Sequence, residues 1–143
     1  MNAVLNRKEV TRDTDGSKFS FRMPRGLIGF EGVVDYCLEA KSSEQPFVRM
    51  KMATGPGTTL YLVPAMLLFP DYNPSFDKED IDFLELGGPE DLLLFVVVNF
   101  NRGATRTANL KGPILINRRT QIGSQVIPKN ANDLSISEPI LNH

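Results

Sequence analysis

The chain has 143 residues, enough for one ordinary domain with a sizeable core, and its 41% hydrophobic and 23% charged residues are typical of soluble globular proteins. Sixteen basic and seventeen acidic residues leave a net charge of -1. This balance removes the long-range attraction that non-specific nucleic-acid binders use, so we expect no direct nucleic-acid partner.

Three further features point to the cytoplasm. The single cysteine, Cys37, cannot form an intramolecular disulfide, and the N-terminus lacks the basic-then-apolar pattern of a secretory signal. The longest apolar run, at 92–98, is too short to span a bilayer. We therefore expect a cytoplasmic protein with no membrane partner.

The first half of the chain is patterned for strands. Residues 35–40 read as a strand around the cysteine, and at 48–52 valine and methionine alternate with arginine and lysine, which is typical of a strand with one wet face. A turn sequence at 54–57 precedes an apolar, β-branched run, so residues 47–64 predict a β-hairpin.

One segment, "SFDKEDIDFLELGG" at 75–88, predicts a short helix. Ser75 can cap its start, acidic residues occupy its first turn, and Ile81 and Leu84 share one face. Gly87 can end it.

The second half predicts more strands. "LLLFVVVNF" at 92–100 has the apolar continuity of a strand buried on both faces, and 104–110 and 113–117 read as two strands separated at Gly112 and Pro113. A last short strand is expected at 124–128. Short strands with glycine and proline punctuation indicate an all-β protein, mainly β with one short helix, built as a small antiparallel barrel or sandwich.

The residues of common catalytic sites are missing. The only histidine is His143 at the very end, and Cys37 has no histidine or basic residue beside it to lower its pKa. "GPGTT" at 55–59 lacks the third glycine of a dinucleotide loop, and acid pairs such as Glu79 with Asp80 suit a helix start better than catalysis. We expect no enzyme activity, no cofactor and no metal.

One stretch imitates a calcium loop. Counted from Asp71, oxygen ligands stand at the first, third, fifth, seventh, ninth and twelfth positions: Asp71, Asn73, Ser75, Asp77, Glu79 and Asp82. The sixth position needs glycine and is Phe76, and the twelfth needs glutamate and is the shorter aspartate. We therefore interpret the stretch as a proline-stiffened turn that leads into a helix.

The loop "LLFPDYNPSF" at 67–76 is rich in prolines and aromatic residues, and two interpretations stay open. Its rings can fold inward as a lid over the end of the barrel. Alternatively Tyr72, next to Asp71, can serve as a rigid, exposed anchor for another protein, because the prolines reduce the entropy lost on docking.

Five stretches together resemble the flagellar assembly factor FliW family, in order and spacing, over about residues 19–140. They are "FRMPRGLIGFEG" at 21–32, "FPDY" at 69–72, "GPEDLLLFVVV" at 88–98, "TANLKGPILIN" at 107–117 and "LSISEPI" at 134–140. The pairing of "GLIGFE" with "NLKGPILIN" is the most specific part. The chain departs from the family pattern at 48–51, where arginine and lysine give the strand a basic outer face.

The resemblance implies a small cytoplasmic β-barrel-like protein without enzyme activity that binds flagellin and the translational regulator CsrA. In the family, the protein bound to CsrA stops that regulator from repressing flagellin messenger RNA, and accumulating flagellin draws it away. An alternative is a flagellin chaperone or structural adaptor that does not bind CsrA. A small nucleic-acid-binding barrel ranks third, because the neighbours of Tyr72 are acidic rather than basic.

The expected organisation is one domain, with an N-terminal strand and ragged segment at 1–18 and a FliW-like barrel at 19–140. No long amphipathic helix announces self-association, so we expect a monomer when the protein is free. The candidate partner-binding residues combine the aromatic loop with acids that would attract the basic CsrA dimer. They are Glu31, Phe69, Pro70, Asp71, Tyr72, Asn73, Asp77 and Glu79.

Two smaller expectations concern the backbone. Gly26, Gly29 and Gly32 fit tight bends between strands. Asn109, Lys111 and Asn117 are expected to satisfy backbone groups at strand ends. All six residues lie in the stretches that resemble the family, and a structural role in the fold would explain their presence there as well as partner binding would.

Overall fold

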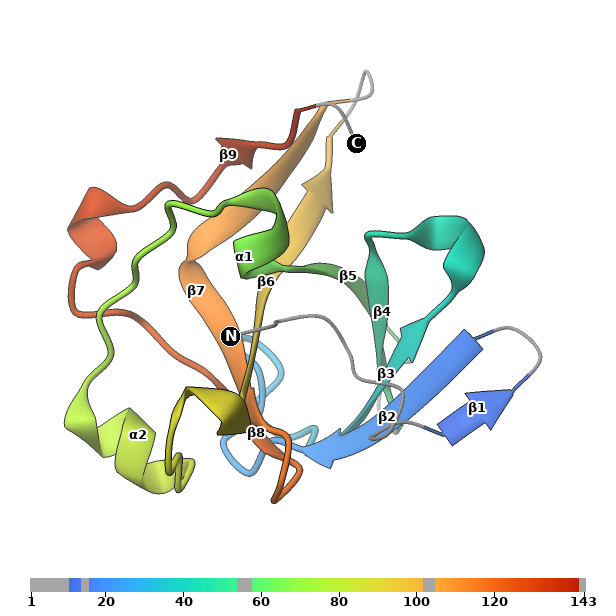
Figure 1. The fold of residues 1–143 in the computed structure, drawn as a ribbon, viewed down its shortest axis with the longest axis horizontal. Coiled ribbons are helices and arrows are strands. Elements are labelled where there is room, and N and C mark those ends of the chain that lie inside the picture. The colour runs from blue at the N-terminus through green and yellow to red at the C-terminus, as the bar shows by residue number, and fades with distance from the viewer. Residues whose placement is uncertain (1–10, 14–15, 54–57, 102–104, 142–143) are drawn as a thin grey trace.

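The computed structural model describes residues 11–13, 16–53, 58–101 and 105–141 (Figure 1). These residues form one sheet of nine strands. The strands are β1 (Thr11–Asp13), β2 (Gly16–Arg22), β3 (Asp35–Ala40), β4 (Val48–Met52), β5 (Thr59–Pro64), β6 (Leu92–Phe100), β7 (Arg106–Asn117), β8 (Ile122–Gln125) and β9 (Glu138–Pro139). The α-helices are α1 (Ala65–Leu68) and α2 (Lys78–Phe83), and the 3₁₀ turns are η2 (Ser42–Glu44), η3 (Pro89–Asp91) and η5 (Ala131–Asp133).

The sheet closes on itself. Each strand from β2 to β8 pairs antiparallel with the next, and β8 returns to β2 through a single parallel pair, Arg22 with Ile122. Two hydrogen bonds support this closure: the Arg22 amide donates to the Gln121 carbonyl at 2.9 Å, and Gln121 Nε2 donates to the Ser20 carbonyl at 2.6 Å. The predicted all-β barrel is therefore confirmed, with α1 as a second short helix that the sequence did not reveal.

The barrel interior follows the predicted alternation. Along β4, Val48, Met50 and Met52 are buried while Arg49 and Lys51 face outward. The pairing of β4 with β5 confirms the hairpin, although its turn at 54–57 lies outside the described residues.

Strand β6 is buried on both faces, as its unbroken apolar sequence predicts. Leu93 and Phe95 point into the barrel core, whereas Leu94, Val96 and Val98 belong to a second core on the outer side of the sheet. The second core is covered by two segments that lie on the same side of β6 and β7 in Figure 1, residues 65–86 and 126–140.

Strand β7 runs through Gly112 and Pro113 without ending, so the prediction of two separate strands is wrong. Between Phe95 and Val97 the register against β7 jumps from Ile114 to Asn109, which places a bulge in β7 at 110–113. The bulge changes which face the side chains occupy. Ile114 lies in the barrel core, while Leu110 lies in the second core, although an uninterrupted strand would place both on one face.

Helix α2 is shorter than predicted at both ends. Its N-cap is Asp77 rather than Ser75, and it ends at Phe83, with Leu84 as the C-cap. Glu85 takes the left-handed backbone conformation expected of Gly87, with φ 53°. The amides of Glu85 and Leu86 donate back to Asp82 and Ile81, which closes the helix end without a glycine.

Asn117 fixes that helix end to the sheet. Its buried Nδ2 donates to the Leu84 carbonyl at 2.8 Å, and its Oδ1 accepts from the amides of Arg119 and Thr120. The expected backbone role of Asn117 is thus confirmed. A neighbouring contact joins the same helix to the 24–32 turn, because Arg25 stacks on the Phe83 ring at 3.9 Å and pairs with Asp80.

The glycines of the 24–32 turn give a matched test of backbone strain. Gly26 and Gly29 have positive φ of 67° and 93°, and a Cβ on Gly26 would lie 2.5 Å from Glu31 Cα, whereas a Cβ on Gly29 or Gly32 would meet nothing within 4 Å. We expect Gly29→Ala to lower the free energy of unfolding by about 1–2 kcal/mol through conformation alone. Gly26→Ala should cost at least about 3 kcal/mol, because the backbone of Glu31 must also move.

Urea denaturation of the three alanine variants measures these costs. Gly32→Ala is the control, and its free energy of unfolding should stay within about 0.5 kcal/mol of the parent protein. Equal losses for Gly26→Ala and Gly29→Ala would contradict the close approach of Glu31 to Gly26.

Candidate functional site

The β7 bulge leaves backbone polar groups of β7 without hydrogen-bond partners in β6. Other segments of the chain supply these partners. The Leu110 amide donates to the Ser135 carbonyl at 2.8 Å, and the Leu110 carbonyl accepts from the Tyr72 hydroxyl at 2.7 Å. The Pro113 carbonyl accepts from the Val126 amide at 3.0 Å. The covering segments are therefore held to the sheet at its irregular point.

Side chains bind two further backbone groups of the bulge. Asn109 Oδ1 accepts from the Lys111 amide at 2.9 Å, and Gln125 Nε2 donates to the Gly112 carbonyl at 3.0 Å. Gln125 Oε1 also accepts from the Ile28 amide at 3.1 Å, which ties the 24–32 turn to the bulge. Asn109 thus has the expected backbone role, while for Lys111 it is the main-chain amide rather than the ammonium group that takes part.

Three isoleucines stand exposed around this bulge, and we call them the isoleucine patch. Ile28, Ile127 and Ile136 are 61%, 54% and 60% exposed. They border one hollow of about 440 Å³, lined by Ile28, Asn109, Lys111, Gly112, Gln125, Ile127, Ala131 and Ile136. Clustered exposed apolar side chains are typical of interaction surfaces.

Of the two interpretations of the aromatic loop, the exposed anchor is wrong for Tyr72. Only 7% of it is exposed, it packs in the second core, and its hydroxyl is bound to Leu110. Burial raises the pKa of the Tyr72 hydroxyl well above its usual range, so the group stays protonated and remains a donor. The lid interpretation of the aromatic loop therefore holds for this residue.

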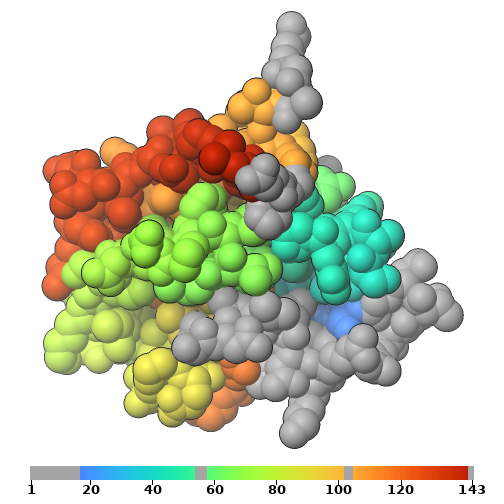
Figure 2. All heavy atoms as spheres, turned by 45° about the horizontal axis from the view of Figure 1, so that its top comes forward, coloured from blue at the N-terminus to red at the C-terminus, as the bar shows by residue number. Residues whose placement is uncertain are grey.

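The other predicted residues of the loop divide between core and surface. Phe69 is half-buried against the second core, whereas Pro70, Asp71 and Asn73 are exposed. The Asn73 carbonyl accepts from Asn130 Nδ2 at 2.9 Å. This bond fastens the loop to the 126–140 segment, and Figure 2 shows the two segments side by side on the surface.

The predicted acids all lie on the surface. Asp77 and Glu79 are exposed at the start of α2, and among the described residues neither they nor Asp71 forms an ion pair. Glu31 is exposed in the 24–32 turn, where the Gly29 amide donates to its carboxylate at 3.1 Å and lowers its pKa. The exposed acids therefore come from three separate segments rather than one loop.

The calcium-like stretch folds as the predicted turn and helix. The Tyr72 amide donates to the Phe69 carbonyl at 2.9 Å, and the Ser75 amide donates to Asn130 Oδ1 at 2.8 Å. Within the described ranges, no group of three or more His, Cys, Asp or Glu residues is placed to hold a metal ion. None of the helices in those ranges is long and apolar enough to cross a membrane.

Sequence reasoning missed the isoleucine patch. Ile28 lies 97 residues before its hydrogen-bond partner Gln125, so no local pattern shows that they meet. One signal was available, because Ile28 and Ile136 lie in two of the stretches that resemble the family. From sequence alone, however, an isoleucine in such a stretch is expected to be a core residue.

Tyr72 now supports a sharp stability prediction. Tyr72→Phe should lower the free energy of unfolding by about 1–2 kcal/mol, because it leaves the buried Leu110 carbonyl without a donor. Tyr72→Ala should cost about 3–5 kcal/mol by adding a cavity in the second core.

Asp71→Asn is the neighbouring control, because Asp71 is exposed, and its unfolding free energy should change by less than about 0.5 kcal/mol. Urea denaturation monitored by circular dichroism measures all three variants. Unchanged stability in Tyr72→Phe would show that the hydroxyl is not needed by the bulge.

Comparison with known proteins agrees with this architecture. The sequence profile of the FliW protein family matches residues 5–140. The flagellar assembly factor FliW of Leptospira biflexa is 30% identical over 134 residues, covering 92% of this chain and 88% of the relative. That of Syntrophus aciditrophicus is 32% identical over 106 residues, covering 73% and 67%.

A solved structure supports the same assignment. The crystal structure of a flagellar assembly factor FliW superposes with a TM-score of 0.78 at 25% identity, covering 93% of this chain and 90% of that one. The barrel, the bulge with its signature residues, and the match over residues 5–140 lead to one conclusion: the chain belongs to the FliW family of flagellar assembly factors.

Proposed function

We propose that this protein is a non-enzymatic, cytoplasmic regulator that binds flagellin and also binds and antagonises a CsrA-type translational regulator. The observation that carries the proposal is the family match over residues 5–140. Through these two partners, free flagellin would control how much of the protein remains to hold CsrA. Synthesis of flagellin would then follow its consumption by the growing flagellum.

The surface offers features suited to such partners. The isoleucine patch provides apolar contact area beside Lys111, and no acidic side chain of the described residues forms an ion pair with that lysine. Asp71, Asp77 and Glu79 provide exposed negative charge elsewhere, and it would steer a basic partner such as a CsrA dimer. An apolar surface and an acidic surface can serve partners of different chemistry.

The alternative is a flagellin chaperone or structural adaptor without CsrA binding. Family membership by itself supports both functions. They differ in one measurement, because only the regulator should form a complex with CsrA.

Isothermal titration of the purified protein with flagellin and with CsrA, separately, tests the proposal. The proposed function expects a stoichiometric complex with each. Binding to flagellin alone would select the adaptor, and binding to neither would reject both functions.

The acidic residues give a prediction for the CsrA complex. Asp71→Lys combined with Glu79→Lys should slow association with CsrA by about tenfold or more at low salt and weaken its salt dependence, because exposed charges act mainly on the association rate. Stopped-flow kinetics at two salt concentrations measures this change. Glu138→Gln, on β9, is the control, and an unchanged rate in the double variant would remove these acids from the interface.

The isoleucine patch gives a prediction of a different kind. Ile136→Asp should weaken the complex with at least one of the two partners by about tenfold, since a charge would enter an apolar contact, while the free energy of unfolding changes little at a 60% exposed position. Titration with each partner measures the affinities. Leu67→Asp, at a comparably exposed leucine on α1, is the control, and full affinity for both partners in Ile136→Asp would exclude the patch.

A further inference from the structure

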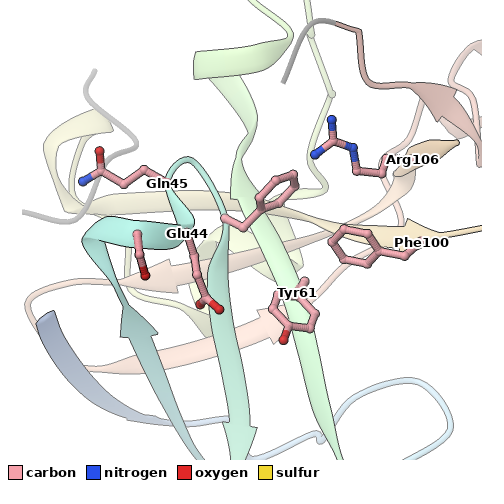
Figure 3. Close-up of a pocket in the computed structure, with 7 residues that line it drawn as sticks. Glu44, Gln45, Tyr61, Phe100 and Arg106 are labelled. Carbon is pink, nitrogen blue, oxygen red and sulfur yellow. The ribbon is translucent and has the colours of Figure 1, made fainter. Parts of the chain in front are cut away.

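A second apolar hollow lies where β6 ends and β7 begins. We call it the Phe100 pocket, a space of about 490 Å³ bordered by Glu44, Phe47, Tyr61, Phe100 and Arg106, among others (Figure 3). Phe47 directly precedes β4, Tyr61 lies on β5, and Phe100 ends β6. Arg106 begins β7. Neither the candidate residues of the aromatic loop nor the isoleucine patch contributes to it.

The rings form a preassembled apolar wall. Phe47 and Phe100 lie 5.6 Å apart between ring centroids, and Tyr61 meets Phe100 edge-on at 5.3 Å. Phe100 nevertheless remains 52% exposed, so the three rings present an apolar face to solvent. A bound apolar side chain would cover the face of Phe100 that the protein itself leaves in water.

The charges of the pocket are unequal. The Glu44 carboxylate accepts two hydrogen bonds from the Arg49 guanidinium, which lowers the pKa of Glu44 and neutralises its charge. Arg106 stacks over Phe47 at 5.3 Å, but it forms no ion pair with any acid of the described residues. In the part of the chain that the structure describes, no carboxylate therefore compensates the charge of Arg106 at the pocket.

The neighbouring strands extend the positive field. Glu39 on β3 is contacted by three lysines, Lys18, Lys41 and Lys51, at 3.9, 3.7 and 3.4 Å. The register pairs Glu39 with Arg49 and Arg49 with Tyr61, so this cluster continues across the sheet to the pocket. Lys41 and Lys51 alone place two ammonium groups against this one carboxylate.

We propose that the Phe100 pocket binds an acidic peptide segment of a partner protein, with an apolar side chain seated on Phe100 and an adjacent carboxylate paired with Arg106. This inference rests on the proposed function, because it names the chemistry that one partner of this binding protein must present. Guanidinium groups bind carboxylates through two parallel hydrogen bonds, and the position of Arg106 beside the aromatic wall would fix the spacing of the two groups on the peptide.

A peptide is favoured over single-stranded RNA. RNA could stack bases on the same rings, but a groove for single strands follows the phosphates with several basic groups, whereas Arg106 is the one basic side chain among the described residues that line the pocket. The net charge of -1 also gives no general attraction for nucleic acid.

Tyrosine fluorescence offers a direct readout, because the chain has no tryptophan and three tyrosines. Tyr36 and Tyr72 are buried with their hydroxyls bound to backbone carbonyls, which leaves Tyr61 as the tyrosine that lines the pocket. A blocked peptide containing a Leu-Glu pair should change the emission of the full chain, and Tyr61→Phe should abolish the change.

Variants of peptide and protein separate the two contacts. Replacing Leu-Glu by Leu-Gln or by Gly-Glu should weaken binding about tenfold each, and so should Phe100→Ala and Arg106→Gln in the protein. Leu67→Ala and Lys129→Gln, both exposed and outside the pocket, are the controls and should bind the Leu-Glu peptide with full affinity. Circular dichroism verifies that each variant is folded.

The other outcomes overturn the inference. Equal affinity for Leu-Glu and Leu-Gln, or full affinity in Phe100→Ala, removes the peptide site. Binding of an oligouridine in place of the peptide identifies an RNA site, and a self-association that Phe100→Ala abolishes identifies a second copy of the chain as the occupant. Peptide binding without flagellin or CsrA binding would instead leave the pocket in place and reject the proposed function.

Discussion

The bulge at 110–113 reverses the side-chain phase of β7, so one strand lines the barrel core with Ile114 and the second core with Leu110. It also leaves buried backbone groups that need partners, and Tyr72, Ser135 and Gln125 provide them. These bonds add to the other polar attachments of the covering segments, which are the Asn117 contact with the Leu84 carbonyl and the pairing of β9 with β7.

The same constraint explains how the surface is organised. Because the bulge draws the 24–32 turn, the loop at 69–77 and the 126–140 segment to one place, stretches from three parts of the chain share a face. Their apolar side chains are divided between two roles. Tyr72 and Phe69 turn inward to the second core, while the isoleucine patch stays outside. Regular pairing through 110–113 would remove the hydrogen bonds by which Leu110, Gly112 and Pro113 hold these segments to the sheet.

Local patterns predicted the elements well where one physical effect dominates. Alternation specified β4, and the unbroken apolar run specified the two buried faces of β6, because both depend only on which side meets water. The patterns failed where residues distant in sequence determine the local backbone structure. Gly112 and Pro113 read as a break since their backbone partners, Gln125 and Val126, are not visible locally.

The candidate site was predictable only in part, for the same reason. The proline and aromatic content of the loop at 67–76 singled it out as a candidate. Whether Tyr72 is exposed, however, depends on its hydrogen bond to the Leu110 carbonyl, 38 residues away in sequence. The Phe100 pocket gave no local signal, because Phe47, Tyr61 and Arg106 meet only after the sheet has formed.

The single pair that closes the barrel has a consequence for folding kinetics. Strands β2 and β8 are about a hundred residues apart, and Arg22 with Ile122 is their one registered pair. Bringing strands so far apart in sequence together has a large entropic cost, and this cost falls once the intervening hairpins have formed. We therefore expect the pairing of β2 with β8 to form late in folding. Few contacts join β2 to β8, so the amide hydrogens there should exchange with solvent through local unfolding. The amide hydrogens of β6 and β7, which share many contacts, should exchange only on global unfolding.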